Sequence, residues 1–241
     1  MSVKLSSVGR ITVWFTALAT ALLSARYFLI PPRWLTFPAA ASVLKGPVGE
    51  SLQNEAPYLY NNHRFVLLFH IACGIVALVL GLFQFVPSLR SSRPTLHRTM
   101  GMFYVSSVVL SGITGFPLSF MMYAAHSPAI RPLFIPTLVG LASLSIAWPL
   151  TTVMALTRAK QHRFADHRAW MIRSYALTFA APTARLLAPV LFLLTSDIVL
   201  AINVTFVSWP LNFLVAELLI RRTEKRSMPA SVPQIAIAMT Q

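Results

Sequence analysis

The sequence predicts an all-α, multi-pass membrane protein with six transmembrane helices, and two observations support this. Of the 241 residues, 56% are hydrophobic and only 11% are charged, and the mean hydropathy is +0.67; soluble domains of this size are far less apolar. Six apolar segments also follow one another, each near the roughly 20 residues that a helix needs to cross a bilayer: 9–30, 65–87, 100–125, 133–157, 169–195 and 198–220. We expect a single membrane domain over 1–241, with a four-helix core over about 65–195.

The first apolar segment follows Lys4 and Arg10 and has two interpretations. A secretory signal peptide has a basic start and a short apolar core, and Ala-Thr-Ala at 19–21 would suit cleavage. The apolar run continues to Ile30, however, which is longer than a typical signal core and long enough to span. We therefore expect a transmembrane helix here, with cleavage as the alternative.

Basic residues predict the orientation of the helices. They gather in the connections on one side of the predicted membrane: Lys4, Arg10, Arg90, Arg93, Arg98, Arg158, Lys160, Arg163, Arg168, Arg221, Arg222, Lys225 and Arg226. The positive-inside rule makes this side cytoplasmic, so both termini are predicted to lie inside. The net charge of +14 would suit a nucleic-acid binder, but its placement at the membrane edges predicts contact with anionic lipid head groups and no nucleic-acid partner.

Two segments lie outside the predicted spans. Residues 31–64 begin with Pro31-Pro32 and contain Gly46-Pro47, and we expect them to form a non-cytoplasmic loop that caps the bundle at the interface. Residues 221–241 are predicted to be a cytoplasmic tail, and nothing in their sequence suggests a function.

The second and third segments each align small residues on one helical face, with histidines on or near that face. In 65–87 this face carries His70, Gly74, Ala77, Gly81 and Gln84. In 100–125 it carries Gly101, Val108, Gly112, Gly115 and Ser119, with His97 and His126 just beyond the two ends. Small residues allow close helix contact or leave room for a flat ligand. Pro117 removes a helix hydrogen bond, so the second alignment can break before His126.

The remaining spans differ in their polar content. The fourth segment contains Trp148-Pro149 and Thr151-Thr152 but no charged residue. The sixth has Asp197 at its outer edge and Glu217 near its inner one, where both carboxylates can reach water. The lone cysteine, Cys73, lies inside an apolar run and is expected to be inert packing.

The fifth segment carries the densest ionisable chemistry of the chain. Arg173 and Arg185 enter the predicted span, and an arginine at that depth costs at least about 2–3 kcal/mol. The predicted core of the second to fifth segments holds no acidic residue, so neither arginine has a protein counter-ion there. We therefore expect both to hold an anionic or polar ligand: haem propionates, the carbonyl oxygens of a quinone, or a lipid phosphate. The alternative is that each side chain reaches the nearer interface.

The histidines allow a haem hypothesis. A b-type haem in a membrane helix core needs two neutral imidazoles that face each other from different helices. The predicted orientation places His70 and His126 toward the outside, and His97 and His167 toward the cytoplasm. We predict His97 with His167 as an inner haem-iron pair and His70 with His126 as an outer pair. The alternative is that these side chains reach interfacial water or phosphate.

Several short runs resemble one known family. They are His70-Ile71-Ala72-Cys73-Gly74, Gly81-Leu82-Phe83-Gln84-Phe85, Leu96-His97-Arg98, Gly101-Met102-Phe103-Tyr104-Val105 and His167-Arg168-Ala169-Trp170-Met171-Ile172-Arg173-Ser174-Tyr175-Ala176, together with Arg185. Over about 63–215 the chain resembles the predicted membrane proteins grouped as domain of unknown function 2306. The resemblance implies a polytopic membrane protein without an established activity. The likeness of the histidine layout to dihaem b-type cytochromes is an analogy of our own.

Two functions follow as hypotheses. The first is a haem- or quinone-binding electron carrier, in which the cofactor binds His70, His97, His167, Arg173 and Arg185. The second is a non-redox protein that binds a lipid or another amphiphile in the same cavity, as a transporter or an accessory factor to membrane-associated biosynthesis. The sequence has no Ser/His/Asp arrangement, paired carboxylates or glycine-rich phosphate loop, so hydrolysis and phosphoryl transfer have no visible site. Enzymatic redox chemistry would need a bound cofactor.

Overall fold

The structure is a computed structural model that describes residues 7–29 and 46–227. The predicted loop residues 31–45 and tail residues 228–241 lie outside this described part. The described residues form helices in the order α1 (Ser7–Leu29), α3 (Gly46–Gln84), α4 (Pro87–Ser92), α5 (Pro94–Ala125), η2 (Arg131–Phe134), α6 (Ile135–Lys160), α7 (Phe164–Thr178), α8 (Ala180–Thr195), α9 (Ile198–Ile202) and α10 (Val204–Ser227). The all-α prediction is confirmed.

The long apolar helices support the predicted membrane bundle. Within the described residues, five helices are long and apolar enough to cross a bilayer, and the count is six if α7 and α8, bent by 42°, form one span. The bend has a local cause, because Pro182 has no N–H to bond the Thr178 carbonyl one turn earlier. Six spans are therefore consistent with the structure, while the N-in orientation stays a prediction.

Residues 46–62 differ from the expectation of a loop, because they form the first half of the 39-residue helix α3. The helix kinks at His63, whose φ of −135° and ψ of 32° are not helical. Pro47 stands at the start of the helix, where its missing N–H costs nothing and its fixed φ favours helix. The proline that suggested a loop therefore marks a helix start.

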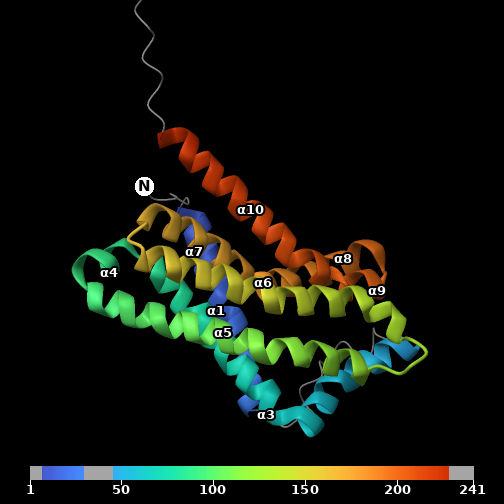
Figure 1. Cartoon of the computed structure of the whole chain (residues 1–241). Coiled ribbons are helices and arrows are strands. Elements are labelled where there is room, and N and C mark those ends of the chain that lie inside the picture. Colours follow the sequence, from blue (N-terminus) through green and yellow to red (C-terminus); the bar gives the residue numbers. More distant parts are fainter. Residues whose placement is uncertain (1–6, 30–45, 228–241) are drawn as a thin grey trace, which may run out of the picture.

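Figure 1 shows how the helices are arranged, with α4 at one end of the bundle and α9 at the other. Consecutive helices α3, α5, α6 and α7 pack against one another, while α10 contacts α6, α7 and α8, and α1 contacts α3 and α8. Glycines permit the closest approaches: a Cβ on Gly81 would overlap the Tyr175 ring, and one on Gly112 would overlap Pro149. These close approaches join α3 to α7 and α5 to α6, while the four-helix core over about 65–195 stays a prediction.

A buried polar network joins α5, α6 and α7. The fully buried Tyr104 hydroxyl lies 2.7 Å from Ser174 Oγ and 3.0 Å from Thr178 Oγ1. Trp148 Nε1 donates to Thr178 Oγ1 over 3.0 Å, and Thr152 Oγ1 lies 2.6 Å from Ser174 Oγ. Because hydrocarbon offers no hydrogen-bond partners, each hydroxyl has found one on a neighbouring helix. The network fixes how these three helices meet.

Candidate functional site

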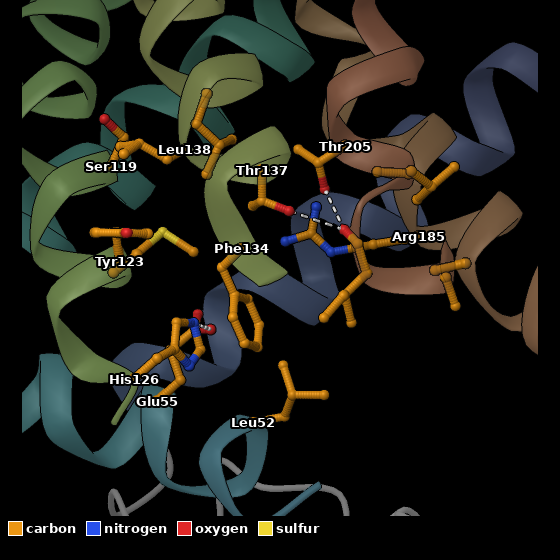
Figure 2. Close-up of a pocket in the computed structure, with 17 residues that line it drawn as sticks. Leu52, Glu55, Ser119, Tyr123, His126, Phe134, Thr137, Leu138, Arg185 and Thr205 are labelled. Atoms are coloured by element: carbon orange, nitrogen blue, oxygen red, sulfur yellow. Dashed lines mark hydrogen bonds and ion pairs between the residues drawn. The ribbon is translucent and has the colours of Figure 1, made fainter. Parts of the chain in front are cut away.

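A pocket of about 270 Å³ lies at the α9 end of the bundle (Figure 2). We call it the α9-end pocket. Its walls come from the first half of α3, the end of α5, η2, the start of α6, α8, α9 and α10, as follows: Leu52, Glu55, Ser119, Met122, Tyr123, His126, Phe134, Thr137, Leu138, Leu141, Ala184, Arg185, Ala188, Ala201, Ile202, Val204 and Thr205. Most of these side chains are apolar, so the few charged ones decide what the pocket can hold.

Arg185 is the cation of this pocket. Figure 2 shows its guanidinium pointing from α8 into the pocket, toward Thr137 and Thr205. The side chain is exposed, and no hydrogen bond or ion pair joins it to another residue in the described part of the chain. Arg26 and Tyr27 of α1 lie near enough to act on it electrostatically. Arg185 thus brings a positive charge into a mostly apolar pocket, and Glu55, the carboxylate of the same lining, contacts His126 instead.

The polar groups nearest to Arg185 are already used inside the protein. Thr137 Oγ1 donates to Asn203 Oδ1 over 2.9 Å and contacts the Ile202 carbonyl at 3.3 Å. Thr205 Oγ1 donates to the same carbonyl over 3.4 Å. These bonds hold α6, α9 and α10 together beside the pocket. Since Thr137 and Thr205 bond within the protein, Arg185 is the polar side chain on this side of the pocket that can bind a ligand.

His126 forms the opposite wall of the pocket and has a full set of partners. Its ring stacks on Phe134 with centroids 3.5 Å apart, Nδ1 lies 2.9 Å from Ser51 Oγ, and Nε2 lies 3.4 Å from a Glu55 carboxylate oxygen. Burial, with a smaller contribution from the charge of Arg131, lowers the pKa of His126 to about 4. The neutral ring donates from one nitrogen only, either from Nε2 to Glu55 or from Nδ1 to Ser51, and accepts at the other.

These partners bear on the predicted outer haem pair. Both nitrogens of His126 are occupied, so an iron ion would have to displace Ser51 or Glu55. His70 Nδ1 donates to the Ser111 carbonyl over 3.0 Å, and its ring fills the space above Gly115 between α3 and α5. The structure gives the two histidines separate partners, and their ligation of haem stays a prediction.

Arg173 corrects one expectation from the sequence. Its Nε pairs closely with Glu217 Oε1, and its Nη2 lies 3.2 Å from Glu217 Oε2. The guanidinium also lies 4.7 Å from the centre of the Trp170 ring. The prediction that Arg173 lacks a protein counter-ion is therefore wrong, because the carboxylate comes from α10, outside the second to fifth spans. Since Glu217 neutralises the charge of Arg173, this arginine does not need the predicted cofactor as a counter-ion.

The predicted inner pair lies near the α4 end. His97 and His167 are close enough to interact electrostatically. His167 Nδ1 donates to the Ala155 carbonyl over 2.8 Å, while His97 Nδ1 is buried without a partner. The described residues contain no group of three or more His, Cys, Asp or Glu side chains that could hold a metal ion. A haem with two histidine ligands is a different arrangement, and here too it stays a prediction.

Comparison with known families identifies the chain. Residues 67–220 match the family described as "Predicted membrane protein (DUF2306)", which covers more than half of the sequence. The chain belongs to this family. The resemblance and the multi-pass membrane location expected from the sequence are thereby confirmed. No curated protein and no solved structure matches.

The DUF2306 match covers only part of the α9-end pocket. It contains Arg185 and His126, and it begins after Leu52 and Glu55, which come from the first half of α3. Sequence reasoning found Arg185 from its depth in an apolar run. It missed Glu55 and Thr137 because their part in the pocket depends on tertiary contacts. Because the chain has only six Asp and Glu residues, Glu55 could have been singled out from the sequence as a candidate site residue.

Proposed function

We propose that this DUF2306 protein is a non-redox membrane protein that binds an anionic amphiphile in the α9-end pocket. The charged group of the ligand would meet Arg185, and its apolar part would lie along Phe134, Leu138 and Leu141. The observation that carries the proposal is the position of Arg185 in the pocket with no partner among the described residues.

The chemistry of the guanidinium defines the ligand class. A cation at membrane depth is costly unless water, an anion or a carbonyl group compensates it. The planar guanidinium matches carboxylates and phosphates, to which it donates two parallel hydrogen bonds. The other charged group of the lining, Glu55, is engaged by His126. A ligand with a carboxylate or phosphate head group therefore suits this pocket.

The size and surroundings of the pocket favour a lipid-like molecule. At about 270 Å³ it is slightly smaller than the ~300–1,000 Å³ of sites that enclose a whole small molecule. It can hold a head group and the upper part of a chain. Next to Arg185 the surface of α8 exposes Leu186, Val190 and Leu193. A long acyl or isoprenoid chain could leave the pocket along this apolar surface without contact with water.

Fluorescence of cis-parinaric acid, which rises in an apolar site, tests this proposal in detergent-solubilised full-length protein. We expect Arg185→Gln to weaken binding of the acid at least tenfold, since a hydrogen bond to a charged group contributes about 1.5–3 kcal/mol. Binding of parinaric methyl ester, which lacks the charge, should change little. Arg222→Gln, at an exposed arginine of α10, is the matched control. Equal affinities of wild type and Arg185→Gln for the acid would refute the proposal.

The haem or quinone carrier is the alternative, and one observation favours it. Nδ1 of both His70 and His167 donates to a main-chain carbonyl, which leaves Nε2, the usual iron ligand, directed elsewhere. Protein purified from haem-replete cells should then show a Soret band, and His97→Ala and His167→Ala should each abolish the inner haem signal. A colourless preparation would eliminate haem binding. A band that both substitutions remove would displace the non-redox proposal.

A further inference from the structure

A second cluster of charged and polar side chains lies at the α4 end, opposite the α9-end pocket (Figure 1). Arg90 of α4 and His167 of α7 both act electrostatically on His97 of α5, and Arg90 also acts on Arg168 of α7. We call Arg90, His97, His167 and Arg168 the α4-end cluster, and Arg98 of α5 adds a further positive charge that acts on His97. Three helices therefore bring two arginines and two imidazoles within electrostatic reach of one another.

Two carboxylates on the helices around this cluster are already paired with other arginines. Asp166, beside His167 in sequence, lies 2.5 Å from Arg163. Glu217, on α10, is paired with Arg173. Like charges gathered at one place repel one another, and this repulsion is relieved when an anion binds between them. An anion bound between Arg90 and Arg168 would therefore stabilise the cluster.

Two buried polar atoms without a partner mark the same place. They are His97 Nδ1 and Gln84 Nε2. The Gln84 amide lies against Gly101, where an added Cβ would be 3.2 Å from Gln84 Oε1. Gly101 follows His97 by one helical turn, so both unpartnered groups face the same side of α5. Buried polar groups are nearly always hydrogen-bonded in native proteins, so a missing acceptor is expected here.

We propose that the α4-end cluster binds a phosphate group. Arg90 and Arg168 supply the charge, and His97 Nδ1 and Gln84 Nε2 donate hydrogen bonds. Phosphate suits this arrangement better than a carboxylate, because it offers three or four oxygens to donors that arrive from several helices. The cluster lies at the end of the apolar half of α3, where the topology expected from the sequence puts the lipid head groups. The phosphate can belong to an anionic phospholipid or to a soluble molecule.

Native mass spectrometry of the full-length protein in detergent tests the lipid source. We expect dioleoyl phosphatidylglycerol to bind more tightly than dioleoyl phosphatidylcholine. The double variant Arg90→Gln/Arg168→Gln should weaken phosphatidylglycerol binding about 25-fold, or about fivefold for each removed charge. Arg221→Gln/Arg222→Gln removes the same charge from exposed positions on α10 and should keep wild-type binding.

Isothermal titration calorimetry with inorganic phosphate tests the soluble source. Phosphate binding that the Arg90/Arg168 double variant loses would support a soluble phosphate-bearing ligand, and selectivity for phosphatidylglycerol alone would support a lipid. The proposal is overturned if neither phosphate nor a preference for phosphatidylglycerol is observed. It is also overturned if both double variants lose binding equally.

Gln84→Met covers the case in which the double variant does not fold. This change removes a buried amide that has no partner and keeps a similar volume, so the ligand-free protein should unfold at a higher temperature. Binding of phosphatidylglycerol or phosphate should still weaken several-fold. Unchanged binding by Gln84→Met would contradict the role of this amide and the location of the site.

Discussion

The Arg173–Glu217 ion pair makes the sharpest prediction about stability. The two side chains are only 18% and 21% exposed, and they join α7 to α10 within the predicted bilayer. Glu217→Leu leaves the Arg173 guanidinium without its counter-ion. Breaking a fully buried pair costs about 3–5 kcal/mol, and because this pair keeps some contact with solvent we expect about 2–3 kcal/mol. For a chain of this length that lowers the Tm by roughly 4–12 °C.

Thermal unfolding in detergent, followed by circular dichroism, measures this effect. The double variant Arg173→Met/Glu217→Leu should recover most of the lost stability, since two apolar side chains replace a buried ion pair at little net cost. Arg222→Met, at an exposed arginine on α10, is the control and should leave the Tm unchanged. If Glu217→Leu is as harmless as this control, or if the double variant is less stable than Glu217→Leu, the pairing described here does not stabilise the fold.

Three further predictions concern the core and the pocket wall. Tyr104→Phe leaves Ser174 and Thr178 without a shared partner and should destabilise the protein by about 1–2 kcal/mol in the same assay; an unchanged Tm would refute the network. Gly81→Ala places a methyl group in the Tyr175 ring and should cost about 1–3 kcal/mol, whereas the same change at Gly74, which has open space, should cost little. Burial lowers the pKa of His126 to about 4 but raises the pKa of its partner Glu55 to about 7, so the two groups change the stability with opposite sign as the pH drops, and their effects nearly cancel between pH 6.5 and 4.5. In His126→Asn only the Glu55 contribution remains, so this variant should gain stability relative to wild type as the pH falls from about 7 to 4.5, by at most roughly 3 kcal/mol; the same pH dependence in wild type and His126→Asn would contradict the assignment.

The membrane architecture was predictable because it follows from composition. Lipid tails cannot hydrogen-bond the backbone N–H and C=O groups of a run of about 20 apolar residues. Such a run therefore forms a helix, in which these groups bond one another. That reasoning located the ends of the spans from 9–30 to 198–220 to within about six residues, except the start of the second, which lies at Gly46 and not at residue 65. It missed the helix over 46–62, because this segment is not apolar enough to span and its prolines indicated a loop. Pro47 at a helix start and Pro57 within the helix are compatible with the helix that forms.

The candidate site was predictable only in part. The depth of Arg185 in an apolar run indicated a ligand-binding cation, and the structure places it in a pocket. The same argument failed for Arg173, because Glu217 lies 44 positions later and meets it only after α10 packs on α7. His126 likewise gained partners from Ser51 and Glu55, about 70 residues earlier, which no local pattern reveals. Contacts between distant segments therefore decide which ionisable groups are free.

Photo-crosslinking tests the central claim, that Arg185 holds an anionic head group in the α9-end pocket, most directly. Full-length protein in liposomes would be labelled with a palmitate that carries a diazirine, and the labelled peptides would be mapped. We predict that the label concentrates on the pocket-lining residues within 134–141 and 184–205, and that Arg185→Gln reduces the labelling about tenfold or more. Labelling spread over the lipid-facing surfaces of α1 and α10, and equal in wild type and Arg185→Gln, would contradict the account.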